Sequence, residues 1–280
     1  MFPRTWLSSA GQIALHWGRL ALAGYLLVLL LLLFFENTLL YPAPRYPTGD
    51  WTATELAHED VFFASTDGTQ LHGWLFEHQS PRAVILYAHG NGDCVAYLGP
   101  YLSQVRDKLR VSIFAFDYRG YGRSEGSPDE PGILADGDAA HRWLAERTGK
   151  RLDEIALMGR SLGGGVAVHL AAQNGARGLI LQNTFTSLPD SAARMYPWAP
   201  VRLLMRNRYD SLSKIERYGG PVLSSHGTND ELVPLELGRK LFDAAPTARK
   251  EFFTIEGGGH NSPEPREYYL TLGRWLGELP

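Results

Sequence analysis

The sequence has very little cysteine and no concentration of basic charge. Cys94 is the single cysteine among 280 residues, which excludes an intramolecular disulfide and a multi-cysteine zinc site. The formal net charge is −3, and no run of five or more Lys or Arg residues occurs. Such a chain lacks the electrostatic footprint of a nucleic-acid-binding protein. We therefore expect no nucleic-acid partner and no metal.

Nucleotide-binding signatures are missing as well. Gly120-x-Gly122-x-x-x-Gly126 follows a strand-like run, but its third glycine comes one residue too late for a dinucleotide fingerprint. No G-K-[ST] phosphate loop occurs either. We expect no organic cofactor. No catalytic motif surrounds Cys94, so we interpret this thiol as a small buried hydrophobe rather than a nucleophile.

Charged residues are absent from residues 20–35, which read LALAGYLLVLLLLLFF. With a few flanking residues this run reaches the length of about 17–25 residues that spans a bilayer. It is apolar all round, which argues against a core helix with one polar face. We predict an N-terminal segment, residues 1–40, with a membrane anchor helix at about 20–40. Residues 41–280 then form one further domain.

The charges around the apolar run favour one orientation. Arg4 and Arg19 precede it and Glu36 follows it, and positively charged flanks tend to stay in the cytoplasm. We expect a single-pass membrane protein whose domain lies on the non-cytoplasmic side, with Trp17 and Tyr41 at the two interfaces. A cleaved signal peptide is the alternative, but no small-x-small cleavage site follows the run.

Short apolar runs recur along the rest of the chain. Asp67-Gly68 separates two β-rich runs and predicts a hairpin. Runs that are apolar on both faces suit a parallel sheet covered on both sides; they lie at residues 83–88, 111–116, 154–159, 178–182, 221–225 and 252–257. Crossover helices are predicted at residues 95–110, 131–148, 162–174 and 234–245. The pattern indicates one α/β domain with a mostly parallel sheet. Residues 185–218 exceed a simple crossover, and we interpret them as a small helical lid.

Polar residues of types that can take part in catalysis follow several of these strands. Ligands of open parallel sheets bind at the carboxyl ends of the strands. Gly159-x-Ser161-x-Gly163 stands between a strand and a helix, as in a nucleophile elbow, where flanking glycines make room for a sharp turn. Asp230 and His260 follow two later strands. The sequence therefore predicts a serine, an acid and a histidine, in that order, at one edge of the sheet.

This combination suits nucleophilic catalysis. A serine hydroxyl becomes a good nucleophile when a base takes its proton, and we assign Ser161 as nucleophile and His260 as base. Asp230 would fix the imidazole tautomer and stabilise the imidazolium. The backbone N–H groups of Leu162 and Asn91 are the predicted oxyanion-hole donors.

Other interpretations of these residues remain. Ser161 can serve as a helix N-cap, and Asp230 as a turn residue with Asp210 as the rival acid. We expect His89 and His226 to be structural. Arg160, beside the nucleophile, can meet an anionic substrate or form a salt bridge.

Six motifs occur together and in order: HGNG, DYRGYGRSEGSP, GRSLGGG, NTFTSLPD, HGTND and GGGHN. From about Leu39 to the C-terminus the chain resembles the α/β-hydrolase superfamily. Within it, the chain is similar to a membrane-anchored branch that includes the Bem46-like proteins and the mammalian α/β-hydrolase-domain proteins 12, 13 and 17. The resemblance implies that Ser161, Asp230 and His260 form a catalytic triad.

The resulting expectation is a serine hydrolase that cleaves carboxylic esters or thioesters through an acyl-enzyme. The anchor and residues 185–218 favour a substrate at the membrane, either a small-molecule ester or lipid, or an acylated protein. A serine peptidase with the same triad is the alternative within enzymes. A catalytically silent membrane scaffold is the alternative outside them.

Overall fold

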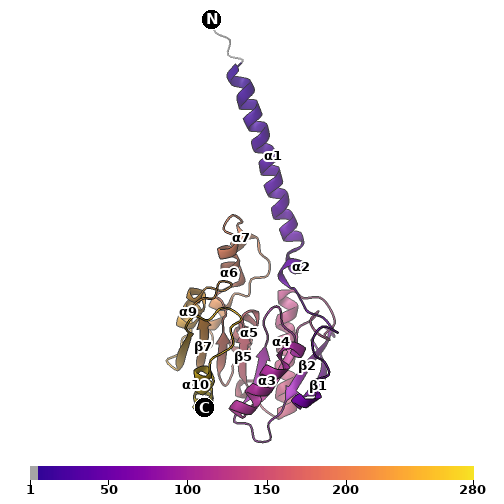
Figure 1. The fold of residues 1–280 in the computed structure, drawn as a ribbon, viewed down its shortest axis with the longest axis vertical. Helices are drawn as coiled ribbons and strands as arrows, with labels where there is room; N and C mark the ends of the chain where they lie inside the picture. Colours follow the sequence, from indigo (N-terminus) through magenta and orange to yellow (C-terminus); the bar gives the residue numbers. More distant parts are fainter. Residues whose placement is uncertain (1–5) are drawn as a thin grey trace.

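A computed structural model describes residues 6–280, whose centre is one eight-stranded sheet (Figure 1). The strand order is β1-β2-β4-β3-β5-β6-β7-β8. The strands are β1 Glu59–Ala64, β2 Gln70–Phe76, β3 Val84–Ala88, β4 Ser112–Asp117, β5 Ala156–Arg160, β6 Leu179–Gln182, β7 Val222–Gly227 and β8 Lys250–Ile255. β1 and β2 form the predicted hairpin, β2 is antiparallel to β4, and all other pairings are parallel. The mostly parallel α/β sheet is thus confirmed.

Helices cover both faces of the sheet, because successive side chains of a strand point to opposite faces. Val84 and Leu86 pack on one face and Ile85 and Tyr87 on the other. The first face carries α4 Glu130–Thr148, α5 Leu162–Asn174, α8 Ser211–Ile215 and α9 Leu235–Ala244. The second face carries α3 Val95–Leu109 and α10 Arg266–Gly277. Two short 3₁₀ helices, η1 Thr54–Leu56 and η2 Leu152–Glu154, complete the connections.

The four predicted crossover helices are present, with ends shifted by at most one residue. Local caps fix these ends. Asp129 accepts a hydrogen bond from the N–H of Gly132 at the start of α4, and Gly149 ends that helix in a left-handed conformation. Helix α10 was not among the predicted elements.

The N-terminal helix α1, Trp6–Phe34, leaves the domain as a separate rod (Figure 1). Its residues Gly11–Phe34 are long and apolar enough to cross a membrane, and none of that stretch is buried in the domain. The candidate span therefore begins earlier than the predicted 20–40. Arg4, used to predict the orientation, lies outside the described residues.

A separate short helix, α2 Glu36–Leu40, follows α1 and contacts the domain. Glu36, which directly follows the apolar run, is buried in the domain. Tyr41, predicted at a membrane interface, is packed into the domain: it is 5% exposed, and its hydroxyl donates a hydrogen bond to the Asn207 side chain at 2.8 Å. These long-range polar contacts turn the end of the N-terminal segment into part of the domain surface.

The region predicted as a lid, residues 185–218, contains three short helices. They are α6 Leu188–Met195, α7 Val201–Leu204 and α8 Ser211–Ile215. Helices α6 and α7 project from the domain on the side from which α1 leaves (Figure 1). Glu36 reaches this region by accepting hydrogen bonds from the backbone N–H groups of Arg206 and Asn207.

Candidate active site

Ser161 stands on the sharp turn between β5 and α5. Its backbone has φ 52° and ψ −116°, a conformation that side chains rarely adopt. The turn is tolerated because its neighbours are glycines. A Cβ on Gly159 would collide with the Gly163 carbonyl, and a Cβ on Gly163 would collide with the Ala88 carbonyl of the adjacent strand. The hydroxyl of Thr184 donates to the Ser161 carbonyl at 2.8 Å and supports the strained residue.

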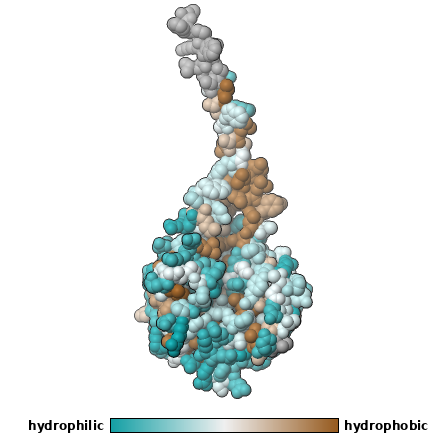
Figure 2. All heavy atoms as spheres, in the orientation of Figure 1, coloured by the Kyte–Doolittle hydropathy of each residue, from teal (hydrophilic) through white to brown (hydrophobic). Residues whose placement is uncertain are grey.

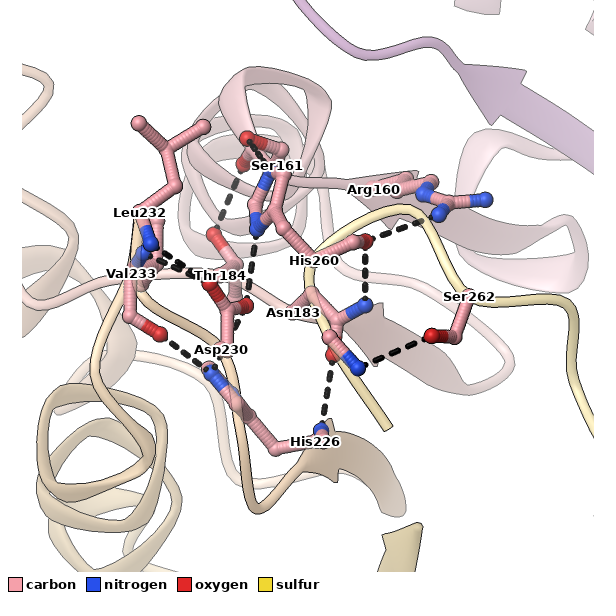
Figure 3. A network of polar contacts seen from close by, with 12 residues as sticks. Arg160, Ser161, Asn183, Thr184, His226, Asp230, Leu232, Val233, His260 and Ser262 are labelled. Atoms are coloured by element: carbon pink, nitrogen blue, oxygen red, sulfur yellow. Dashed lines mark hydrogen bonds and ion pairs between the residues drawn. The ribbon is translucent and has the colours of Figure 1, made fainter. Parts of the chain in front are cut away.

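The structure brings Ser161, His260 and Asp230 into contact (Figure 3). His260 Nδ1 lies 2.7 Å from Asp230 Oδ2, and His260 Nε2 lies 3.0 Å from Ser161 Oγ. A carboxylate only accepts hydrogen bonds, so Nδ1–H donates to Asp230. Nε2 is then free to accept the proton of the Ser161 hydroxyl. The arrangement provides a base next to a nucleophile, with an acid behind the base.

Asp230 is held as a carboxylate. Burial opposes its ionisation, but hydrogen bonds from His226, His260 and the backbone of Val233 outweigh burial and hold its pKa below the ordinary value of 3.8. Its Oδ1 accepts from the N–H groups of Leu232 at 3.0 Å and Val233 at 2.8 Å. One oxygen is thus committed to the backbone, and Oδ2 is left for His260.

The backbone of His260 is held by two side chains, of which the sequence interpretation missed Asn183 and left two alternatives for Arg160. Arg160 and the Asn183 amide each donate to the His260 carbonyl at 2.9 Å (Figure 3). Asn183 also accepts a hydrogen bond from the N–H of Gly227 at 3.1 Å, at the end of β7. Arg160 lies 3.8 Å from Glu264. Of the two alternatives for Arg160, the structure shows the ion pair, and the same side chain supports the backbone of His260.

Asn91 lies in the loop after β3, where it contacts helix α2 of the N-terminal segment. Its side-chain amide donates to the Leu40 carbonyl of α2 at 2.6 Å, and its Oδ1 accepts from the Tyr121 hydroxyl at 2.7 Å. Within residues 6–280, the backbone N–H groups of Asn91 and Leu162 have no hydrogen-bond acceptor.

The alternative residues have structural contacts. Asp210 caps α8 by accepting from the N–H of Ser213, so it does not replace Asp230. His89 is fully buried, and its Nδ1 donates to the Gly90 carbonyl at 2.8 Å. His226 Nε2 donates to the Val233 carbonyl at 2.8 Å. Burial raises the pKa of Cys94 to about 11, so this thiol is not ionised at neutral pH.

A strand-to-helix turn that presents a serine to a histidine and an acid, at the carboxyl edge of a parallel sheet, is the arrangement of α/β hydrolases. The comparisons with known proteins agree. Residues 83–212 match the family model described as alpha/beta hydrolase fold. The chain is 37% identical to a Mycobacterium tuberculosis protein over 232 residues, 82% of each chain. The chain therefore belongs to the α/β-hydrolase family.

Two further relatives show which members of that family the chain is similar to. It is 32% identical over 261 residues to the protein bem46 of Schizosaccharomyces pombe, with 87% of this chain and 86% of bem46 covered. It is 30% identical over 230 residues to the human alpha/beta hydrolase domain-containing protein 17C, with 79% of this chain and 67% of that protein covered. Among solved structures, the Pyrococcus furiosus esterase Pf2001 shares the fold, with a TM-score of 0.72, 19% identity, and coverage of 86% of this chain and 98% of that one.

Proposed function

We propose that this chain is a membrane-anchored serine hydrolase that cleaves carboxylic esters or thioesters. The observation that carries the proposal is the pair of contacts of His260, to Ser161 at 3.0 Å and to Asp230 at 2.7 Å. The esterases and the monoacylglycerol lipase among the structural neighbours have the same fold and support a hydrolase.

The reaction begins with Ser161. His260 Nε2 removes the hydroxyl proton as Ser161 Oγ attacks the carbonyl carbon of the substrate. His260 then returns that proton to the leaving alcohol or thiol as the ester bond breaks, which leaves an acyl group on Ser161. In the second half, His260 takes a proton from water as the water oxygen attacks the acyl carbonyl. His260 then returns that proton to Ser161 Oγ as the bond to Ser161 breaks and the carboxylic acid leaves.

The remaining groups stabilise charges that develop during these steps. Asp230 is ionised at neutral pH and stabilises the imidazolium of His260. The N–H groups of Asn91 and Leu162 are assigned to the oxyanion of the tetrahedral intermediate. Each such donor typically contributes about 2.7–4 kcal/mol to transition-state stabilisation. No cofactor takes part in this scheme.

The substrate class follows from the location that we propose. With α1 in the membrane, the domain meets lipids, so that esters of lipids or acylated proteins are the favoured substrates. We place the domain on the non-cytoplasmic side, because Arg4 and Arg19 precede the span and Glu36 follows it.

A fluorophosphonate probe, which reacts with activated serines, tests the nucleophile. We expect the full-length protein in detergent to be labelled, and Ser161→Ala not to be labelled while it remains folded. Ser80→Ala, at an exposed position, is the matched control and should label normally. A folded wild-type protein that resists the probe would contradict the proposed function.

Two further measurements address substrate and orientation. Esters of rising chain length should be hydrolysed with a preference for long acyl chains; equal turnover of acetyl and long-chain esters would count against a lipid substrate. A membrane-impermeant probe should label Ser161 in intact cells as well as in lysates. Labelling in lysates alone would reverse the proposed orientation.

A further inference from the structure

Helices α6 and α7 are joined by an apolar turn, and residues 195–205, called here the α6–α7 tip, are mostly exposed. We propose that the α6–α7 tip enters the same bilayer that α1 spans. The domain is then fixed to the membrane at two points, and its partner at the second point is the lipid itself. The inference rests on the membrane anchoring in the proposed function, and goes beyond it by assigning a second surface to lipid.

The C-terminal end of α1 shows how far the apolar part of the bilayer must extend toward the domain. Large apolar side chains remain exposed down to the last turn of the helix, where Phe34 is 77% exposed and Phe35 follows it. Apolar surface of this extent is unfavourable in water. The apolar part of the membrane must therefore reach about as far as Phe34 if α1 spans it. Figure 2 shows the same continuous apolar surface on the lower part of the rod.

The α6–α7 tip lies beside α1 well above that end. The Tyr25 hydroxyl donates to the Trp198 carbonyl at 3.0 Å, and the two rings meet edge to face with centroids 6.4 Å apart. Tyr25 precedes Phe34 by nine residues, which is about 14 Å along a helix axis. A bilayer that covers Phe34 must therefore also surround Trp198.

The composition of the α6–α7 tip suits this position. Its exposed large apolar side chains are Met195, Tyr196, Trp198 and Leu203, the last 81% exposed. Its one charged residue, Arg202, is also exposed and pairs with Asp190 at 2.8 Å. Arginines stand next to them. Arg206 donates to the Leu33 carbonyl at the end of α1. Apolar and aromatic residues next to basic ones are typical of segments in the membrane interface, where arginine meets anionic headgroups.

Several backbone N–H groups of the tip are paired within it, as polar backbone groups in a lipid environment require. Pro197 and Pro200 have no N–H to satisfy. The N–H groups of Tyr196, Ala199 and Leu203 donate to carbonyls within residues 192–200. The Trp198 carbonyl, at the turn itself, is the one that accepts from Tyr25.

Contact with the bilayer through both α1 and the α6–α7 tip would orient the active site toward the membrane. Helix α2 continues from α1, and its Leu40 carbonyl contacts the Asn91 side chain of the predicted oxyanion loop at 2.6 Å. The carboxyl edge of the sheet therefore lies on the same side as the anchor. A lipid leaving the bilayer beside the tip would have a short path to this edge.

Spin-label accessibility tests the insertion. In a Cys94→Ala background, Leu203→Cys is labelled and the full-length protein is placed in liposomes of phosphatidylcholine and phosphatidylglycerol. Leu270→Cys, on α10 and 61% exposed, is the matched control. We expect the label at 203 to be reached by oxygen but protected from a water-soluble nickel complex, and the label at 270 to show the reverse. Equal nickel accessibility at both positions would overturn the proposal.

A charge at the same position gives an independent readout. We expect Leu203→Asp to reduce hydrolysis of a long-chain monoacylglycerol in liposomes roughly tenfold or more, because charges are unfavourable in the bilayer. Its turnover of a soluble acetyl ester should match wild type, as should both activities of Leu270→Asp. Unchanged liposome activity would contradict the inference. A wild-type protein that hydrolyses neither ester would instead contradict the proposed function, while the accessibility result would still decide the insertion.

Discussion

The carboxyl edge of the sheet and the junction of α2 with residues 206–207, called here the membrane-proximal side because of the proposed anchoring, are held in different ways. At the sheet edge, Ser161 is positioned by a turn of a few residues in which glycines allow backbones to touch. On the membrane-proximal side, Glu36 joins α2 to residues 206–207, about 170 positions away in sequence, through hydrogen bonds of 2.8–3.1 Å. The first region depends on local shape, and the second on long-range polar contacts centred on one carboxylate.

This difference predicts different responses to mutation. Changes at the sheet edge should alter chemistry while leaving the fold in place, provided that the glycines are kept. Changes on the membrane-proximal side should loosen a segment and leave the chemistry of a soluble ester largely intact. The following four variants test this distinction, from the largest expected effect to the smallest.

Asp230→Asn should have the largest effect. The asparagine oxygen would take over the bonds from the Leu232 and Val233 N–H groups, so that its NH₂ would face His260 Nδ1. The imidazole would then hold its proton on the wrong nitrogen. We expect kcat to fall by about 10⁴, the order seen when a serine-protease triad is changed in this way. Steady-state hydrolysis of an acetyl ester measures it.

The control for this variant is Asp210→Asn, since Asp210 caps α8 and makes no contact with His260. Its activity should be near wild type. If Asp230→Asn retained most of its activity and Asp210→Asn did not, the acid would be assigned to the wrong residue.

Asn183→Ala should have the next largest effect. It removes one of the two donors to the His260 carbonyl and the acceptor of the Gly227 N–H. We expect kcat to fall roughly 10–100-fold with little change in KM, because a shift of a catalytic group by about 1 Å can reduce the rate about 10²-fold. Asn174→Ala loses a side-chain bond to Asp138 far from the site and is the matched control. Equal losses in the two variants would mean that Asn183 has only a structural role.

Glu36→Gln should mainly affect the membrane-proximal side. The glutamine would direct an NH₂ group at the donors of Arg206 and Asn207, and a mispaired buried polar group typically costs about 1–3 kcal/mol. We expect faster hydrogen exchange at the amides of residues 206–207 and nearly unchanged hydrolysis of an acetyl ester. Glu256→Gln, at an exposed position, should change neither quantity. Unaltered exchange in Glu36→Gln would show that the carboxylate does not hold the segment.

The sequence was sufficient to predict most of the sheet edge. The apolar runs placed the strands, and the rule that polar residues after parallel strands meet at one edge placed Ser161, Asp230 and His260 together. The same rule would have found Asn183, which directly follows β6, had it been applied to that strand. The apolar spacing of Tyr268, Leu272 and Trp275 likewise carries the helical signal of α10.

The membrane-proximal side could not be predicted in the same way. A charge after an apolar run suggests the end of a membrane span, and no local pattern indicates that Glu36 is buried against Asn207. The contact of Tyr25 with Trp198 also joins residues 173 positions apart. Such contacts follow from the packing of the complete chain, whereas the nucleophile turn follows from neighbouring residues.

The pH dependence of the free energy of unfolding distinguishes Glu36, on the membrane-proximal side, from histidines in the packed interior. The histidine variant should have the smallest effect of the four at neutral pH. Burial lowers the pKa of His141 to about 4, and among residues 6–280 its Nδ1 has no partner. Below about pH 6.5 the unfolded chain binds a proton that the folded protein does not, so the free energy of unfolding falls as the pH drops from 6.5 to 4. His169, whose pKa is also about 4, acts in the same window.

His141→Gln keeps a donor for the Leu152 carbonyl and removes one of these two titrations. Between pH 7 and pH 5, the loss of unfolding free energy should be smaller in this variant than in wild type by about 2 kcal/mol.

Glu36 differs in the pH range over which it affects stability. Burial raises its pKa, but hydrogen bonds from Asn207 and Arg206 outweigh burial and lower the pKa below 4.5. Its contribution to stability is therefore present above that pH and is lost as the pH falls below it. Glu36→Gln should therefore parallel wild type from pH 7 to 5 and diverge only in stronger acid. Urea unfolding at several pH values measures both, and identical curves for wild type and His141→Gln would exclude His141 as a source of acid sensitivity.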